Sequence, residues 1–247
     1  MKILKRVLSI CLFMTYMQAF AQEKKDSIAL SNILGELQNL YKQKDIGFDI
    51  HYTYASELHP DVILDSLSGH LDIAGGNYHY QMSNMEMTAN ERYVITLFKE
   101  DKVMYLSKPS ADSINPVEQM WLSLKMMGID HCSFSEFPTF KSIKITFKSG
   151  GIYKEMRMEL DSKTGYPIGM EYVIKTEMLL APNERSSDVT KEYGEYAIVC
   201  CRYSDYKSLI TRTGMFDEQA FFSQKGKEFE PKKAFEDYQV FVGSPNL

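Results

Sequence analysis

The chain has 247 residues, and 28 basic against 33 acidic side chains give it a formal net charge of −5. This length suits one large all-β domain or one and a half average domains, and the core is large enough to fold without disulfide bonds. The acidic balance argues against nucleic-acid binding, which needs clustered basic residues, and against electrostatic binding to anionic lipid head groups.

The first 21 residues have the three-part plan of a secretory signal peptide. A basic start is followed by an apolar stretch over residues 7–17, and Ala19-Phe20-Ala21 supplies small residues at the −3 and −1 positions. The apolar stretch is shorter than the roughly 20 residues that span a bilayer. We therefore expect an exported, periplasmic protein that starts at Gln22, has no transmembrane segment and carries a net charge of about −8.

Three cysteines follow this segment: Cys132, Cys200 and Cys201. An odd number allows at most one disulfide, and neighbouring residues of a strand point to opposite faces. Buried free thiols are the favoured interpretation, with a strained vicinal disulfide as the alternative. The sequence has no CxxC motif and no zinc-like Cys/His spacing, so no metal site is expected.

Residues 28–44 form the longest helical pattern after the leader. Apolar side chains recur every three or four positions: Ile28, Leu30, Ile33, Leu34, Leu37, Leu40 and Tyr41. One face of this helix is therefore apolar and should pack against the rest of the protein.

From Asp45 the apolar period changes to two, which predicts strands. A strand over 48–54 is followed by a polar linker around Pro60, and Gly75-Gly76-Asn77 predicts a tight turn before a strand over 78–82. The apolar alternation continues at Met85 and Met87, which are odd-numbered positions, whereas Tyr78, Tyr80 and Met82 are even-numbered. This change predicts a bulge or bend near Ser83-Asn84. Strands over 92–98 and 102–106 complete an antiparallel meander.

The second half of the chain repeats this plan after a loop over 109–116. A helix is predicted for 117–128, ending at Gly128. The further predicted elements are strands over 142–148, 153–160, 168–178, 196–206 and 238–242, a turn over 161–165, a polar insertion over 181–194 and an aromatic tail from Gly214.

Several segments in this order resemble one family. They are Phe48–Tyr52 as a first strand, Gly69–Ile73 followed by Tyr78, Lys102–Leu106 after an acidic turn, and Met156–Leu160 running into Asp161–Pro167. Over residues 28–178 the chain resembles the periplasmic lipoprotein carriers of the outer-membrane localisation pathway and their wider Lol-type half-barrel superfamily. No functional residue of the carriers is carried over to a position here.

The resemblance implies an α+β, β-rich fold in which a curved antiparallel sheet, a half-barrel, wraps one or two helices around an apolar cavity for acyl chains. We expect residues 22–247 to form a single half-barrel-like domain with a C-terminal extension from about 195. The four tyrosines of the first strands should share one concave face, with the helix over 117–128 against it.

Nine residues are candidates for the lining of a ligand cavity: Tyr52, Tyr54, Tyr78, Tyr80, Met82, Trp121, Leu124, Met156 and Met158. A curved sheet encloses apolar pockets, and flexible methionines suit varied apolar partners. The alternative is that these side chains are ordinary core, because burial alone explains a period-two apolar face.

Catalysis has little support in the sequence. It contains no G-x-S-x-G elbow, no HExxH motif and no glycine-rich phosphate loop. His51 and His79 fall on polar strand faces, where a metal would need a third ligand, so we interpret them as surface histidines. We expect neither an enzyme nor a cofactor.

The sequence thus leads to two hypotheses. The first is an exported periplasmic binding protein that holds a lipid acyl chain, another apolar ligand or a lipidated protein. The second is a non-enzymatic structural or assembly factor of the cell envelope that binds a protein through its aromatic tail, with Phe216, Phe221, Phe222, Phe235 and Phe241.

Overall fold

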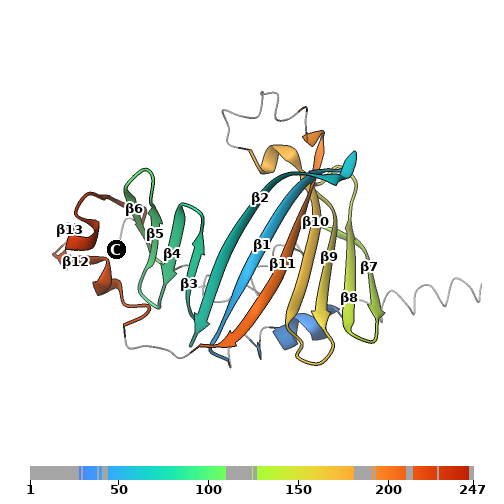
Figure 1. Cartoon of the computed structure of the whole chain (residues 1–247), viewed down its shortest axis with the longest axis horizontal. Helices are drawn as coiled ribbons and strands as arrows, with labels where there is room; N and C mark the ends of the chain where they lie inside the picture. Colours follow the sequence, from blue (N-terminus) through green and yellow to red (C-terminus); the bar gives the residue numbers. More distant parts are fainter. Residues whose placement is uncertain are drawn as a thin grey trace, which may run out of the picture.

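One large, open, curved sheet dominates the computed structural model of the chain (Figure 1). The structure describes residues 28, 30–37, 39–40, 44–109, 124, 127–180, 191, 193–209, 214–226 and 228–244. The leader, most of the predicted helix over 117–128 and most of the polar insertion lie outside these residues. Residues 30–37 and 39–40 are helical, as predicted.

Twelve strands form this sheet in the order β14-β6-β5-β4-β3-β2-β1-β11-β10-β9-β8-β7. All neighbours are antiparallel except β14 and β6, which are parallel. The strands are β1 Ile46–Ser56, β2 His59–Ala74, β3 Asn77–Met82, β4 Met85–Ala89, β5 Val94–Phe98, β6 Val103–Ser107, β7 Ile129–Glu136, β8 Phe140–Phe147, β9 Tyr153–Asp161, β10 Pro167–Lys175, β11 Tyr196–Ser208 and β14 Gln239–Val242.

The C-terminal segment adds smaller elements to this sheet. Strands β12 (Phe222–Lys225) and β13 (Glu228–Pro231) form a separate hairpin. Three short 3₁₀ helices are η1 (Thr176–Met178), η2 (Glu218–Ala220) and η3 (Lys233–Phe235). Strand β11 lies between β1 and β10 at the centre of the sheet. The C-terminal segment that follows the central strands therefore begins after Ser208, the last residue of β11.

The β2–β3 hairpin has the tight turn that its sequence predicts. Gly75 and Gly76 have φ of +55° and +84°, and Ala74 pairs with Asn77. A two-residue turn with both central φ values positive follows the twist of the strands, and glycine adopts it without strain.

The structure differs from the sequence analysis in three local features. Pro60 lies inside β2 and not in a linker, because this part of β2 pairs with β1 alone and a free edge tolerates proline. Ser83 and Asn84 form a two-residue hairpin turn and not a bulge, since Met82 pairs directly with Met85. Strand β7, which the sequence analysis left out, forms one edge of the sheet.

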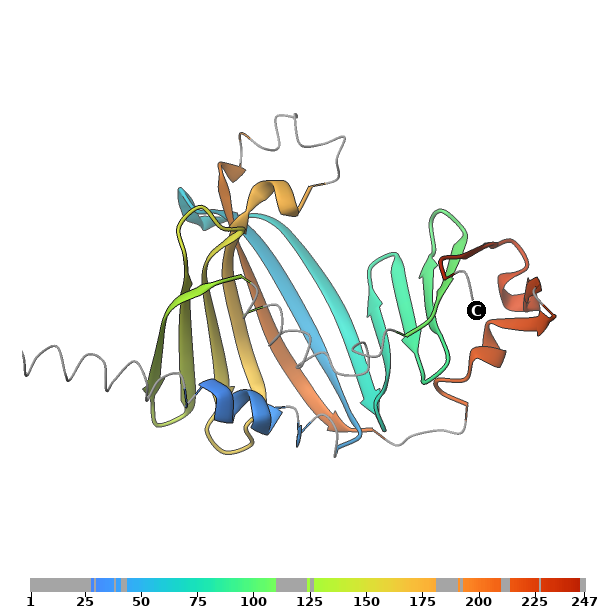
Figure 2. The same ribbon diagram turned by 180° about the vertical axis from the view of Figure 1, so that it is seen from behind.

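Cross-strand pairing places one row of apolar side chains on a single face of the sheet. Tyr52 pairs with Cys201, Cys201 with Met170, Met170 with Met158 and Met158 with Ile143. We call this the inner face, because the N-terminal helix packs on it over β7–β9 (Figure 2). A curved, unclosed antiparallel sheet with a helix on its inner face is the half-barrel expected from the sequence.

The N-terminal helix covers the inner face at the end of the sheet formed by β7–β9. Its side chains Leu30, Ile33, Leu34 and Leu37 are 3–5% exposed and pack in one cluster with Ile143, Ile145, Met156, Met158 and Leu160. Leu124, from the predicted second helix, is 1% exposed in the same cluster. Most of the helix over 117–128 lies outside the described residues, so its expected position against the tyrosines stays a prediction.

At the other end of the sheet the apolar core lies on the opposite, outer face. Tyr80 pairs with Met87, Met87 with Thr96 and Thr96 with Tyr105, so these side chains share the inner face. The alternate residues of β5 and β6 point outward and are covered by the C-terminal segment: Ile95, Leu97, Met104 and Leu106 are 0–1% exposed in a cluster with Phe221 and Phe222.

The expected orientation of the four tyrosines is confirmed. On β1, Tyr52 and Tyr54 alternate with His51 and Thr53, which point to the outer face. On β3, Tyr78 and Tyr80 pair with Ile73 and Leu71 of β2. These two residues pair in turn with Ile46 and Phe48, which lie on the inner face of β1. Their side chains pack around the central cluster of Ile46, Phe48, Ile50, Ile73, Ile174, Val199 and Cys201.

These faces predict opposite effects at two adjacent positions. Tyr52→Asp places a carboxylate on the apolar inner face and should destabilise the protein by about 2 kcal/mol, lowering the melting temperature by about 6 °C. His51→Asp changes an exposed outer side chain whose partner is Ser68, and should change stability by under about 0.5 kcal/mol. Thermal melts of both variants measure this difference, and equal losses would contradict the assigned faces.

Candidate ligand-binding site

Among the described residues, the N-terminal helix covers one end of the inner face and no element covers its centre. Under the N-terminal helix the buried side chains are at most 7% exposed. Around the central cluster, by contrast, the ring side chains are only partly buried: Tyr52, Tyr54, Tyr78, Tyr80, Tyr172, Tyr203 and Tyr206. The centre therefore presents a wide aromatic surface that the helix does not cover.

The hydroxyls of Tyr52, Tyr78 and Tyr80 on this surface make weak hydrogen bonds to each other or to sulfur. The Tyr80 hydroxyl lies 3.4 Å from that of Tyr52 and 3.0 Å from Sδ of Met82, and the Tyr78 hydroxyl donates to Sδ of Met87 at 3.4 Å. Burial raises the pKa of Tyr52, Tyr78 and Tyr80 and raises the pKa of the Cys201 thiol to about 12. The surface is thus uncharged at neutral pH.

A pocket of about 340 Å³ opens beside these tyrosines. Its lining consists of Tyr54, Asp65, Leu67, Thr176, Leu179, Leu180 and Tyr193. The volume lies in the range of sites that bind small molecules, roughly 300–1,000 Å³. The lining is mostly aromatic and aliphatic, with a few polar groups that could orient a ligand.

Two irregular segments build this pocket. Asp65 and Leu67 belong to the part of β2 that has no neighbour on its β3 side, so this edge stays open. On the other side, the Thr176 amide donates to the Glu195 carbonyl, and the Leu179 amide closes η1 onto the Thr176 carbonyl. The hydroxyl of Thr176 is buried without a hydrogen-bond partner.

The predicted lining residues fall into three places. Tyr54 lines the pocket, and Tyr52, Tyr78, Tyr80 and Met82 lie on the open centre of the inner face. Leu124, Met156 and Met158 are 1%, 7% and 3% exposed and pack against the N-terminal helix. Trp121 lies outside the described residues.

Sequence reasoning missed most of the pocket wall. Asp65 and Leu67 fell in the supposed linker, Leu179 and Leu180 directly precede the polar insertion, and Tyr193 lies inside it. A signal was present in β2, because Leu67, Leu71 and Ile73 keep one parity through Gly69. For η1 and Tyr193 there was no periodic signal.

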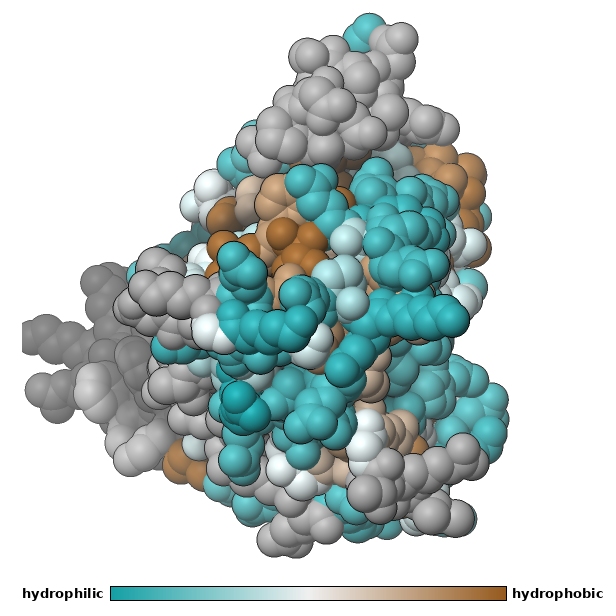
Figure 3. Space-filling view, turned by 90° about the vertical axis from the view of Figure 1, so that its left-hand side faces the viewer, coloured by the Kyte–Doolittle hydropathy of each residue, from teal (hydrophilic) through white to brown (hydrophobic). Residues whose placement is uncertain are grey.

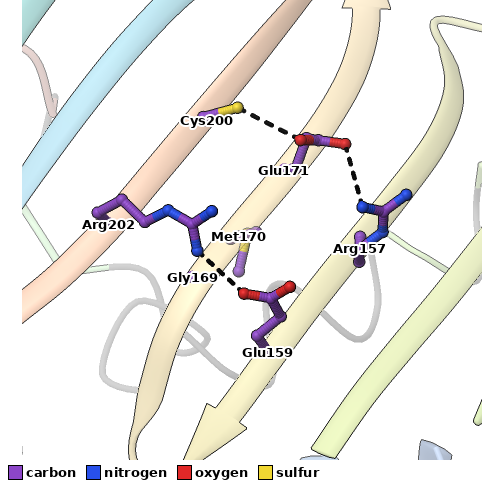
Figure 4. A pocket seen from close by; sticks show the side chains of 7 residues that line it. All are labelled: Arg157, Glu159, Gly169, Met170, Glu171, Cys200 and Arg202. Atoms are coloured by element: carbon purple, nitrogen blue, oxygen red, sulfur yellow. Dashed lines mark hydrogen bonds and ion pairs between the residues drawn. The ribbon is translucent and has the colours of Figure 1, made fainter. Parts of the chain in front are cut away.

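The outer face of the central strands carries paired charges (Figure 4). Arg202 on β11 forms an ion pair with Glu159 on β9 at 2.9 Å, and its side chain crosses Gly169 of β10. A Cβ atom at position 169 would lie 2.4 Å from Nη1 of Arg202, so a larger residue there would displace the arginine. Glu171 contacts Arg157 at 3.9 Å and Sγ of Cys200 at 3.4 Å. The hollow between them is about 30 Å³, room for about one water molecule.

The three cysteines of the described chain are free thiols, as the favoured interpretation expected. Cys132 and Cys201 are buried, while Cys200 is half-buried on the outer face. Pairing of Tyr52 with Cys201 and of Thr53 with Cys200 confirms that the two neighbours point to opposite faces.

Three histidines of the outer face, His51, His70 and His79, have polar partners. His70 lies between Asp49 at 2.5 Å and Asp72 at 3.1 Å, and His79 contacts Glu86 at 3.0 Å. Strand β2 separates His51 from His79. Among the described residues, no three His, Cys, Asp or Glu side chains are placed to hold a metal ion.

No protein-family model and no curated protein matches the sequence. Solved structures that resemble the chain include an uncharacterised conserved protein from Thermus thermophilus (9% identity, TM-score 0.48, covering 87% of this chain and 99% of that one). They also include a LolA superfamily protein from Nitrosomonas europaea, with 10% identity and a TM-score of 0.35, covering 76% of this chain and 97% of that one. A third is LprF from Mycobacterium bovis, with 10% identity and a TM-score of 0.32, covering 73% of this chain and 93% of that one. All three have a TM-score below 0.5 and a sequence identity of 10% or less.

The cluster around His70 predicts a pH dependence of stability. Burial opposes protonation of His70, but its hydrogen bonds to Asp49 and Asp72 outweigh burial and raise the pKa of His70, while the bond from His70 lowers the pKa of Asp49. The contribution of His70 is therefore complete below its unfolded pKa of about 6.5 and disappears as pH rises through the raised value. The contribution of Asp49 disappears at acidic pH.

Urea unfolding at about pH 5.5 and about pH 8.5 tests this expectation. The wild type should lose under about 1 kcal/mol over this range, since His70 and Asp49 are 42% and 49% exposed and solvent screens the pairs. His70→Asn should remove this loss, and His51→Asn should keep it. A His70→Asn variant with the wild-type slope would show that the cluster does not titrate in this way.

Proposed function

We propose that the protein is an exported carrier that binds an apolar ligand, such as a lipid acyl chain, on the inner face of its half-barrel. The pocket of about 340 Å³ beside the partly exposed tyrosines is the observation that carries this proposal. A core that served stability alone would be expected to bury these rings, as the N-terminal helix buries its own contacts. The proposal is for binding, without a covalent step.

Burial of the ligand would supply the binding energy. Each buried CH₂ group contributes about 0.8 kcal/mol, so a chain of ten contributes about 8 kcal/mol before the cost of association is subtracted. The uncharged tyrosines of the inner face suit such a chain, because their rings are apolar and their hydroxyls already have partners.

The proposed export rests on the leader sequence at residues 1–21. None of the helices in the described part of the chain is long and apolar enough to cross a membrane. A carrier in the periplasm would move apolar molecules through water between two membranes, which requires that the ligand be shielded from solvent.

Binding of an envelope protein is the second candidate function. The tail that suggested it is largely packed into the protein: Phe216, Phe221 and Phe222 are 3–8% exposed, and Phe235 stacks on Phe221. Phe241, however, is 44% exposed, and on the same face lie Tyr105 (41%) and Phe98 (40%). Figure 3 views this end of the molecule and shows brown apolar surface beside teal hydrophilic surface.

Ligand binding can be tested with the neutral probe N-phenyl-1-naphthylamine, whose fluorescence rises in apolar surroundings. The wild type should bind it, and Leu67→Trp should weaken binding by about tenfold because the indole fills the pocket. Leu58→Trp is the matched control, since Leu58 is 73% exposed and does not line the pocket. Thermal melts would verify that both variants fold.

Organic extraction of the purified protein followed by mass spectrometry completes this test. Bound lipid is the expected result. A protein that carries no lipid and binds no probe would contradict the proposed function, and a stoichiometric protein partner in its place would favour the second candidate. Probe binding that Leu67→Trp leaves unchanged would place the ligand elsewhere on the inner face.

Export has its own test. Expression of the full chain in a Gram-negative host should yield periplasmic protein whose first residue is Gln22. Replacing Ala21 by a bulky residue should block the cleavage and leave the precursor with the membrane fraction. Wild-type protein that keeps Met1 and stays in the cytoplasm would contradict the proposed export.

A further inference from the structure

The charge of the pocket indicates which head group it would accept. Asp65 is the only charged side chain among the described residues that line it. The remaining lining residues are two tyrosines, three leucines and Thr176. We propose that this pocket holds the protonated amine of an alkyl chain, and that Asp65 selects such amphiphiles against those with an anionic head; this inference rests on the proposed function.

The Asp65 carboxylate has no cationic partner among the described residues. Its Oδ1 accepts the backbone amide of Ser66 at 2.7 Å, and no ion pair between described side chains involves it. The negative charge of Asp65 is therefore available to a ligand.

The effect of this charge reaches the aromatic wall of the pocket. Burial is the main cause that raises the pKa of Tyr54, and the nearby Asp65 carboxylate raises it further. A carboxylate beside two tyrosine rings attracts an ammonium group, because ring faces and carboxylate both favour positive charge. The same surroundings disfavour a carboxylate or phosphate head by like-charge repulsion.

Thr176 provides a second, independent observation. It lines the same pocket, is 1% exposed, and its hydroxyl oxygen has no hydrogen-bond partner. An unsatisfied buried hydroxyl destabilises a protein, and a ligand N–H group that reached this oxygen would remove that deficit. A primary amine carries three such donors, enough for both Asp65 and Thr176.

The rest of the pocket fits the alkyl part of such a ligand. Leu67, Leu179 and Leu180 supply aliphatic walls, and Tyr54 belongs to the cluster that continues to Tyr52 and Tyr80. A head group at Asp65 would thus leave its chain to run along the open centre of the inner face.

Displacement of N-phenyl-1-naphthylamine by three C12 amphiphiles, each below its micellar concentration, tests the head-group preference. At neutral pH dodecylamine should displace the probe at about tenfold lower concentration than dodecanoate, with dodecanol in between. Asp65→Asn should reduce this ratio to about threefold or less. Asp61→Asn is the matched control on the same strand and should keep the wild-type ratio.

Thr176→Val provides a second readout, because it removes the hydroxyl and keeps the shape of the side chain. This substitution should weaken the affinity for dodecylamine by a few-fold and leave the affinity for the naphthylamine probe unchanged. It should not lower the melting temperature of the free protein.

A wild type that prefers dodecanoate, or a ratio that Asp65→Asn leaves unchanged, would overturn the head-group assignment while the binding function stands. A wild type that does not bind the probe at all would overturn the binding function and this assignment together.

Discussion

The pairing of β1 with β2 on one side and with β11 on the other determines which side chains reach the inner face. Antiparallel neighbours share parity, so the position of Tyr52 sets that of Cys201, Met170, Met158 and Ile143 across the sheet. A slip of one residue at β1 would move its apolar side chains, Tyr52 among them, to the solvent side and bring His51 inward. The aromatic surface, the pocket beside it and the contacts of the helix all depend on this register.

Two segments of the chain cover opposite faces of the sheet at its two ends. The N-terminal helix buries the inner face of β7–β9, and the C-terminal segment buries the outer face of β5 and β6. Between them the centre keeps its tyrosines partly exposed. Burial is thus nearly complete under both coverings, while at the centre the ring side chains around the buried central cluster stay partly exposed.

The outer face of the central strands is held by charges and not by apolar contacts. Arg202 crosses Gly169 to reach Glu159, and His70 joins Asp49 to Asp72. Such pairs, partly exposed to water, contribute modestly to stability, but they keep the outer face polar while the inner face is apolar. Under the proposed function, this contrast would direct an apolar ligand to one side of the sheet.

The sequence by itself determined the helix, most strands, the tight turns and the faces of Tyr52, Tyr54, Tyr78 and Tyr80, because these follow from local periodicity and turn chemistry. It did not place β11 at the centre or β7 at an edge, since strand order depends on contacts between distant segments. Nor did it bring Asp65 and Thr176 to one pocket. That site joins a free edge of β2 to an irregular segment after β10, and only tertiary packing brings the two together.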